Sequence, residues 1–404
     1  MSAADAPPLC GTLLRVGTRP LDTAHGGFVV HEFLDLTARQ PALVLTRGDC
    51  GGEAPLLARV HSSCVTSESF GGADCDCAGQ LDAALERIAR AGRGALFYLL
   101  QEGRGAGLVA KARDRMLVQA SRDRVTTFDA YARMGLDRDY RRYDAVAFAA
   151  AALGLRAPLA LLSNNPEKVA ALRDAGVAIT AVEGLERAPS PFNLHYLTAK
   201  SRSGHALQAA APPAGAATPP EPVTAFEPTP LAALPRFMRV AQYLLPVRAE
   251  PPAEGVHWLR VHLYVDGTSG RERVIFSVPA GLKIPPPPPS SKGGIDVSSS
   301  QGERGGIPLV HVTAERLLER LPRRPRRDDW RAAVAALAAR GAGCALCLLH
   351  DDPELARHGS AAAAVAADAD LARLIAHHLP GRAELYRDDA ALAAALRAAG
   401  VALA

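Results

Sequence analysis

The stretch ALFYLLQEGRGAGL, residues 95–108, decides the fold class. It begins with a run of apolar residues, the pattern of a strand buried on both faces, and continues through a glycine-rich turn into a helical pattern that starts near Leu108. Arg104 lies in that turn, where a guanidinium beside the free N–H groups of a helix can bind an anion. Glycine is common in such turns, so the turn alone is not specific. A strand followed directly by a helix predicts an α/β domain.

Further patterns on both sides extend this alternation through residue 208. We expect strands at 42–45, 57–60, 159–162 and 177–179. One helix has Leu81, Leu85 and Ile88 on a single face and should end at Gly92. Another should begin at Asn164-Asn165-Pro166 and end at Gly176.

Three cysteines, Cys64, Cys75 and Cys77, lie in a polar segment of this domain. Their neighbours are Ser, Thr, Glu and Asp, whereas a buried free cysteine behaves as a small hydrophobic residue. A structural zinc site usually has four Cys or His ligands, while a catalytic site has three and leaves one position for water or substrate. Three cysteines therefore indicate a working metal, with buried thiols as the alternative.

Length and composition limit the class of protein. The 404 residues suggest two or three domains, and 46 Lys and Arg against 42 Asp and Glu do not indicate a nucleic-acid partner. No apolar run is long enough to span a bilayer, so we expect no membrane partner. Seven cysteines, an odd number, and no charged-then-apolar leader favour a cytoplasmic protein over a secreted one.

Two composition changes divide the chain. Residues 1–208 form the first predicted domain, and residues 209–225, rich in Pro and Ala, are a predicted linker. Residues 226–404 form a second domain, expected to be α/β as well. Within it, the Pro, Ser and Gly residues of 285–306 predict a disordered loop.

The second domain resembles a degenerate repeat of the first. Residues 335–349 resemble 85–100, residues 396–403 resemble 172–179, and Arg260-Val261-His262 resembles Arg59-Val60-His61. Chance similarity between Ala-rich helices is the alternative. No cysteines follow at the required spacing, which predicts a single metal site per chain. Cys344 and Cys347 lie in an apolar strand pattern that points them to opposite faces, so we expect buried thiols.

Many short motifs around the three cysteines resemble the GTP cyclohydrolase II family in order and spacing, over about residues 10–207. The motifs are Arg59-Val60-His61-Ser62, Gln80, Gln101-Glu102-Gly103-Arg104, the Asp139-x-Arg141-x-Tyr143 pattern, Asn164-Asn165-Pro166 with Lys168, and Asn193-Leu194-His195-Tyr196-Leu197. Several independent motifs in family order are far more specific than any one of them.

The resemblance implies a mixed-sheet catalytic domain that opens the guanine imidazole ring of GTP at C8. Formate and pyrophosphate would be released, in the first step of riboflavin synthesis. One Zn²⁺ per catalytic domain would bind Cys64, Cys75 and Cys77, and Mg²⁺ would accompany the triphosphate. The resemblance also implies a homodimer.

The resemblance assigns roles to individual residues. Asp139 matches the proton acceptor and Arg141 the residue proposed to attack the α-phosphate, although a guanidinium stays protonated and would act more easily as an electrostatic clamp. The implied GTP contacts are Arg59, Val60, His61, Ser62, Ser63, Gln80, Glu102, Gly103, Arg104, Thr127, Ser163 and Lys168.

Three positions depart from the commoner family pattern. Ser63 stands where Glu is frequent, Ser163 replaces Thr, and Arg115 occupies a position that is often Tyr. If position 115 helps to order the water beside the zinc, the reaction could stop at the formylated, ring-opened intermediate. A guanine-nucleotide-binding regulator without turnover is the alternative from another class of protein.

Overall fold

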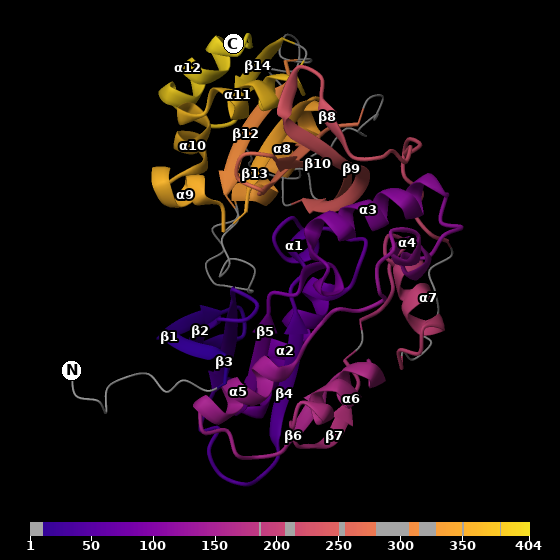
Figure 1. Ribbon diagram of the computed structural model, residues 1–404, viewed down its shortest axis with the longest axis vertical. Coiled ribbons are helices and arrows are strands. Elements are labelled where there is room, and N and C mark those ends of the chain that lie inside the picture. The colour runs from indigo at the N-terminus through magenta and orange to yellow at the C-terminus, as the bar shows by residue number, and fades with distance from the viewer. Residues whose placement is uncertain are drawn as a thin grey trace, which may run out of the picture.

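The computed structural model describes residues 11–185, 187–206, 215–249, 255–279, 307–314, 329–349, 351–379 and 381–404. Two mixed sheets with covering helices confirm the predicted α/β fold class. The first half of the chain occupies the lower part of Figure 1 and the second half the upper part, and α1 and α3 lie where the two meet.

The first sheet has seven strands in the order β1-β2-β3-β5-β4-β6-β7. Neighbours are antiparallel from β1 to β5 and parallel from β5 to β7. In a parallel sheet, ligands bind beyond the carboxyl ends of the strands. The strands are β1 (Leu13–Thr23), β2 (Gly26–Asp35), β3 (Gln40–Arg47), β4 (Leu56–Ser62), β5 (Gly94–Leu99), β6 (Leu159–Leu162) and β7 (Ile179–Glu183).

Helices cover both faces of this sheet. On one face α2 (Cys77–Ala91) buries Leu81, Leu85 and Ile88 as predicted and ends at Gly92, whose φ of 74° suits glycine. On the other face lie α5 (Asp144–Ala152) and α6 (Pro166–Asp174). The remaining helices are α1 (Val65–Glu68), η2 (Glu102–Gly105), α3 (Gly107–Ala120), α4 (Thr127–Arg133) and α7 (Leu194–Arg202).

The predicted strands and helices of the first half are found with shifts of a few residues at their ends, except that the strand predicted at 177–179 shares only Ile179 with β7. The β1–β2 hairpin has no counterpart among the predicted strands. Its outer face is largely exposed, with Val16 57% and Val29 40% accessible. Because the apolar alternation is interrupted on that face, its periodicity is weak.

The second sheet has eight strands in the order β15-β14-β12-β13-β11-β10-β9-β8. Its strands are β8 (Thr229–Leu231), β9 (Leu234–Ala249), β10 (Gly255–Asp266), β11 (Glu272–Ser277), β12 (Leu309–Ala314), β13 (Gly343–Leu348), β14 (Arg382–Leu385) and β15 (Ala402–Leu403). The helices are α8 (Asp329–Arg340), α9 (Pro353–His358), α10 (Ala361–Ala367), α11 (Ala369–Ala376) and α12 (Ala390–Ala398).

Apart from β8, the second sheet repeats the strand order and directions of the first. Antiparallel neighbours run β9-β10-β11-β13 and parallel neighbours run β13-β12-β14-β15, as β1-β2-β3-β5 and β5-β4-β6-β7 do in the first sheet. Helices α8 and α12 stand in the places of α2 and α6. This correspondence supports the repeat, while a duplication of the chain stays a prediction.

One of the three predicted matches is wrong in this topology. Arg260-Val261-His262 lies in β10, an antiparallel strand in the place of β2. The place of β4 is taken by β12, which pairs in parallel with β13 as β4 pairs with β5; in that register Val312-Thr313 lie where Val60-His61 lie in β4. Three residues are too few to distinguish one strand of a sheet from another.

Cys344 and Cys347 are buried thiols on opposite faces of β13, as predicted. Cys344 packs in the core under α10, α11 and α12, and Cys347 packs in the core that faces the first half. The predicted linker is described only from residue 215, where no helix or strand occurs up to 225, and the predicted loop at 285–306 lies outside the described residues. Among the helices that the structure describes, none is both long and apolar enough to cross a bilayer.

Candidate functional site

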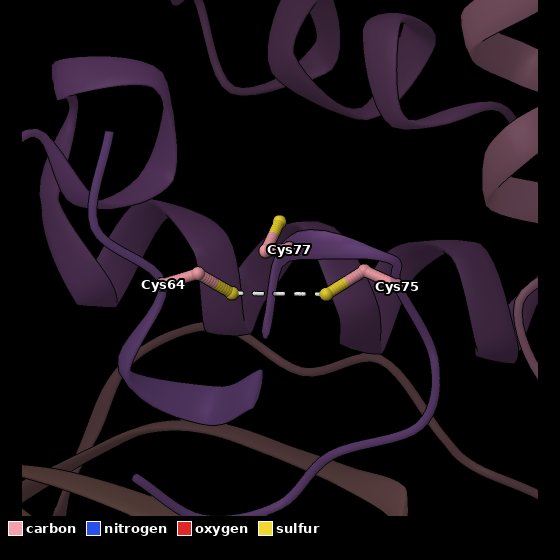
Figure 2. Close-up of side chains that lie close together, drawn as sticks. All are labelled: Cys64, Cys75 and Cys77. Carbon is pink, nitrogen blue, oxygen red and sulfur yellow. Dashed lines mark hydrogen bonds between the residues drawn. The ribbon is translucent and has the colours of Figure 1, made fainter. Parts of the chain in front are cut away.

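The three cysteines come from the end of a strand, a loop and the start of a helix. β4 ends at Ser62, and the Ser63 N–H still donates to the Leu99 carbonyl at 2.8 Å, so the strand pairing fixes the approach to Cys64. Cys64 caps α1, and Cys77 is the first residue of α2, two residues after Cys75. Figure 2 shows the Cys64 and Cys75 sulfurs facing each other, with Cys77 beside them.

The spacing of the sulfurs fits a metal ion. The Sγ atoms of Cys64 and Cys75 are 3.7 Å apart, and all three sulfurs lie within 4.8 Å of one another. Tetrahedral zinc with Zn–S bonds of about 2.3 Å needs sulfurs about 3.8 Å apart. A small closing movement would therefore satisfy three of the four positions. No other such group of His, Cys, Asp and Glu occurs among the residues that the structure describes.

A buried lysine that sequence reasoning missed supports this group. Lys111 Nζ lies 3.0 Å from Cys64 Sγ and 2.7 Å from Glu102 Oε1, and the Val65 N–H donates to Glu102 Oε2 at 2.6 Å. Burial alone would lower the pKa of Lys111, but Cys64 and Glu102 outweigh it and raise the pKa well above its usual value. A cation in this position balances negative charge on the sulfurs, and thiolate is the form of cysteine that binds metals.

The sequence carried a signal for Lys111. Leu108, Lys111, Ala112, Arg115 and Met116 share one face of α3, and that face is buried. Two cations on an otherwise apolar helical stripe are unusual, because a buried charge needs a partner. The thiols also interact, since hydrogen bonds from Cys64 and then Cys77 lower the pKa of Cys75 well below its usual value.

Arg59 and Gln80 belong to a buried polar chain beside Cys77. Arg59 donates to the Leu162 carbonyl and to Gln80 Oε1, both at 2.7 Å. Gln80 donates to Asp76 at 2.6 Å, and Lys200 pairs with the other oxygen of Asp76 at 2.7 Å. Burial lowers the pKa of Arg59 to about 10, so the group remains a cation at neutral pH. Asp76 and Lys200 were not predicted as site residues.

His61 and Ser63 each leave a buried polar atom without a hydrogen-bond partner. His61 Nε2 lies 2.8 Å from Glu68 Oε1 and its ring stacks on Tyr98, while its Nδ1 has no partner in the structure. Arg59 Nε and Ser63 Oγ are also buried without a hydrogen-bond partner. Buried polar groups are rarely left unpaired. These atoms are consistent with a ligand that binds along the end of β4, where Ser62 also lies.

Lys168 brings a second buried cation to the same place. Its Nζ donates to the Val60 carbonyl at 3.0 Å and lies 5.7 Å from the centre of the Tyr143 ring. Burial, followed by the charges of Arg59 and Arg141, lowers the pKa of Lys168 well below its usual value. An anion would relieve that repulsion. Ser163, just before the α6 cap, accepts a hydrogen bond from the Asn165 N–H at 3.2 Å.

Asp139 and Arg141 pair with each other. The Arg141 Nε lies 2.8 and 3.0 Å from the two Asp139 oxygens, and its Nη2 makes a further close ion pair. Burial alone would raise the pKa of Asp139, but the bonds from Arg141 lower it. Those bonds likewise outweigh burial and raise the pKa of Arg141. In this arrangement the ionised form of Asp139 and the protonated form of Arg141 are both favoured.

The turn from Glu102 to Gly105 is held in an uncommon backbone conformation. Gly103 and Arg104 both have φ of 56°, which costs energy for a residue with a side chain. Tyr131 donates to the Gly103 carbonyl at 2.7 Å, and the Arg104 guanidinium lies 4.2 Å from the centre of the Phe128 ring. The turn therefore presents Arg104 from a fixed backbone.

Thr127 and Arg115 lie on the side of α3 that faces α4 and α7. Thr127 donates its hydroxyl to Asp114 at 2.7 Å. Arg115 pairs with Asp74, the residue before Cys75, at 2.8 Å, and lies 5.0 Å from the centre of the Tyr196 ring. An adjoining cavity of about 120 Å³ is lined in part by Arg115, Thr127, Tyr196 and Trp258.

Most of the predicted site residues, together with Lys111, form two adjoining groups. The cysteines, Glu102 and Lys111 make the metal-side group, and the anion-side group contains Arg59, Asp139, Arg141 and Lys168. They adjoin at Arg59, whose pKa responds to Cys77 as well as to Arg141. Gln80 and the end of β4 lie between them, whereas the Thr127 hydroxyl is engaged by Asp114.

Three sulfurs that could hold a metal ion, next to buried cations on a mixed α/β sheet, are the arrangement expected of a metal-dependent enzyme domain with an anionic substrate. Comparison with known proteins agrees. The sequence model of the family described as GTP cyclohydrolase II matches residues 14–183. Two relatives, both named GTP cyclohydrolase-2, are from Shewanella amazonensis, 38% identical over 193 residues, and from Saccharophagus degradans, 40% identical over 195 residues. The matched parts are 92% and 96% of those proteins and 48% of this chain. The chain belongs to the GTP cyclohydrolase II family.

Proposed function

We propose that the first half of this chain is a zinc-dependent GTP cyclohydrolase II. It would open the imidazole ring of GTP at C8 and release formate and pyrophosphate, as the first step of riboflavin synthesis. The observation that carries the proposal is the group of three sulfurs within 4.8 Å, next to the cations of the anion-side group, in a chain that belongs to this family.

Cys64, Cys75 and Cys77 would hold the zinc. Bound zinc would leave one position free and supply an activated water for attack at C8. The protein's own part is to keep the thiols close and their charge balanced. Lys111 does this from α3, because its Nζ contacts both Cys64 and Glu102.

The anion-side group would hold the triphosphate. Arg59, Arg141 and Lys168 bring three cations together, and the Glu102–Gly105 turn presents Arg104. Phosphate oxygens would accept hydrogen bonds from these side chains and reduce their mutual repulsion. The atoms left unpaired at Arg59, His61 and Ser63 support binding along the end of β4. Mg²⁺ with the triphosphate is part of this proposal.

Asp139 and Arg141 have complementary roles in the proposal. Asp139 is ionised and can accept a proton, while Arg141 is a cation and suits a clamp on the α-phosphate. A guanidinium with a raised pKa is a poor nucleophile. A covalent guanylyl adduct isolated on Arg141 would contradict the clamp.

A second product remains open because of Arg115. Its side chain is engaged by Asp74 and Tyr196 and offers no hydroxyl at this position. The alternative product retains the formyl group on the opened ring. A regulator that binds guanine nucleotides without turnover is less well supported, since binding alone does not require a three-cysteine group and an ionised Asp139 together.

Product analysis tests the function. Purified protein with zinc, magnesium and GTP should release formate and pyrophosphate in equal amounts, and Asp139→Asn, which keeps the shape of the side chain, should stop turnover while nucleotide still binds. Ring opening without formate would establish the formylated product, and Arg115→Tyr should then restore formate release. Nucleotide binding with neither zinc nor turnover would favour the regulator.

Two further parts of the proposal concern the setting of the enzyme. None of the cysteines that the structure describes is joined in a disulfide, which agrees with the proposed cytoplasmic, reducing location. The homodimer implied by the family resemblance stays a prediction, and light scattering of the full chain would test it.

A further inference from the structure

One edge of the second sheet is only partly paired within its own half. β9 pairs along almost its whole length with β10, but on its other side β8 reaches only from Leu234 to Arg239. The edge from Val240 to Ala249 is therefore open to another partner. An open strand edge presents unpaired N–H and C=O groups and is normally covered.

Helix α3 of the first half covers the beginning of this edge. Arg113 donates to the Val240 carbonyl at 3.0 Å. Gln119 bonds both the N–H and the C=O of Leu244, at 2.8 and 2.7 Å, as a paired strand would. The same helix carries Lys111, which contacts Cys64, and Arg115, which contacts Asp74.

The segment that joins Cys64 to Cys75 covers the rest of the edge. Gly72 forms an antiparallel bridge with Val247. The Ala73 N–H donates to the Pro246 carbonyl at 2.7 Å, and the Arg248 N–H donates to the Gly71 carbonyl at 3.0 Å. A Cβ on Gly72 would lie 2.6 Å from the Thr66 carbonyl oxygen and 3.0 Å from Leu245, so the close approach requires glycine.

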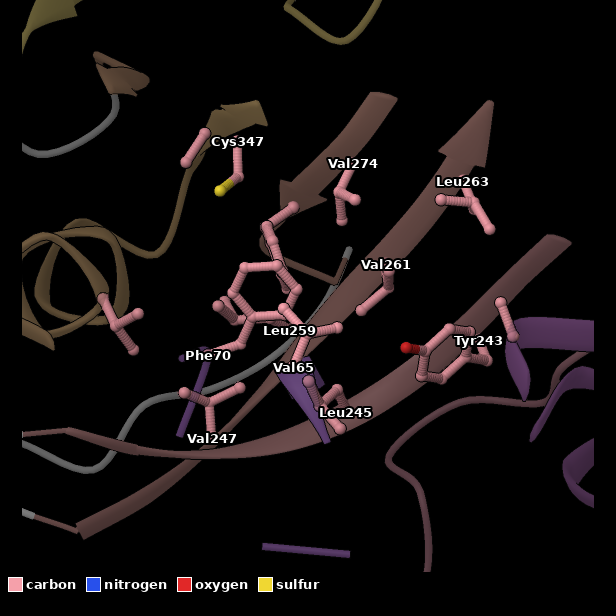
Figure 3. Close-up of a cluster of buried hydrophobic side chains, with 14 of the residues drawn as sticks. Val65, Phe70, Tyr243, Leu245, Val247, Leu259, Val261, Leu263, Val274 and Cys347 are labelled. Atoms are coloured by element: carbon pink, nitrogen blue, oxygen red, sulfur yellow. The ribbon is translucent and has the colours of Figure 1, made fainter. Parts of the chain in front are cut away.

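Phe70 anchors this segment in the core of the second half. Figure 3 shows Phe70 and Val65 of the first half among Leu245, Val247 and Leu259. The Phe70 ring lies 4.9 Å from that of Phe276 and 5.7 Å from that of Trp330. Trp330 also donates its Nε1–H to the Phe70 carbonyl at 2.9 Å. Phe70 is 2% exposed.

We propose that the second half is a scaffold for the metal loop, the segment that joins Cys64 to Cys75. The β9 edge and Trp330 would hold this loop in position. The loop segment 70–73 completes the sheet of the second half, two residues before Cys75. The matched part of the relatives amounts to 48% of this chain, so this scaffold lies outside what they match. The inference rests on the proposed zinc site, and it makes Trp330 a positioning residue for zinc binding without contact to the metal.

Zinc affinity and hydrogen exchange in the full chain test the scaffold. Trp330→Ala should weaken zinc binding by roughly tenfold or more, measured by competition with a chromophoric chelator. In wild type the segment between Cys64 and Cys75 is already held in place, whereas in the variant zinc binding must also order that segment. Trp330→Phe keeps a ring but loses the hydrogen bond to Phe70, and should weaken binding about fivefold. The amide of Ala73 should exchange faster in both variants.

Leu396→Ala is the matched control, because Leu396 is fully buried in the core on the opposite face of the second sheet. It should lower thermal stability but leave zinc affinity within about twofold and Ala73 exchange unchanged. Equal loss of affinity in Leu396→Ala and Trp330→Ala would overturn the scaffold, as would unchanged affinity and exchange in both Trp330 variants. Wild-type protein without zinc affinity would overturn the metal proposal instead, and Ala73 exchange would still decide whether Trp330 holds the loop.

Discussion

Replacing Lys111 by Met tests the charge balance beside the three sulfurs. Lys111 is 8% exposed, and its Nζ is the cation within hydrogen-bond distance of both Glu102 and Cys64. Methionine has a similar length and no charge, so the substitution keeps most of the packing on α3. Glu102 would be left as a largely buried carboxylate that, among the residues the structure describes, accepts hydrogen bonds only from the backbone N–H groups of Val65 and Gly103.

The expected loss follows from that unpaired charge. Breaking a buried ion pair from one side typically costs 3–5 kcal/mol, and we expect about 3 kcal/mol here because Glu102 keeps two backbone donors, the N–H groups of Val65 and Gly103. Changing Glu102 to Gln in the Lys111→Met background removes the unpaired charge. The double variant should recover about 1–2 kcal/mol of the free energy of unfolding.

Urea denaturation of reduced, zinc-free protein gives these free energies of unfolding. Wild type, Lys111→Met, Glu102→Gln and the double variant together form a double-mutant cycle. Zinc titration of the same proteins should show weaker binding in Lys111→Met, since Cys64 loses its cation. The reasoning would be refuted by a Lys111→Met variant within about 0.5 kcal/mol of wild type. It would also be refuted if the second substitution destabilised the protein further.

Three further predictions concern single residues. Cys77→Ser should lower zinc affinity by about a hundredfold or more in a chelator competition, and retained affinity would exclude Cys77 as a ligand. Lys168→Met should raise the KM for GTP roughly tenfold, because a phosphate contact is lost. The same substitution should stabilise the fold by about 1 kcal/mol, because burial and neighbouring cations disfavour the charge of Lys168. Steady-state kinetics would measure the KM and urea denaturation the stability, and a less stable variant would contradict the argument. Burial, then Lys200, lowers the pKa of His205 from 6.5 to about 4, so its neutral form is favoured in the fold and its contribution to stability is lost as pH falls from about 6.5 towards 4. His205→Asn should flatten the stability profile in that window, and an unchanged slope would assign it to other groups.

Much of the first half could be predicted from the sequence because its signals are local. The apolar run ending at Leu99, the helical face of α2 and the Asn165 cap of α6 each depend on a few neighbouring residues. The cysteine pair at Cys75 and Cys77 is close in sequence, so its nearness in space follows directly. Arg260-Val261-His262 shows the limit, since a strand's place in a sheet depends on its partners and not on its own residues.

The sequence by itself determined the α/β class, the three thiols and the cations of the anion-side group, because residue type and short-range periodicity carry those properties. Only the tertiary structure brought Cys64, at the end of β4, to the other two thiols, and placed Lys111 against its sulfur. Only the tertiary structure joined the metal loop to β9 and Trp330, more than 150 residues away in the chain. Such contacts depend on which strand edge the second half leaves open. Because the hydrogen-bonding groups of the backbone are the same in every sequence, residue types do not show which edge that is.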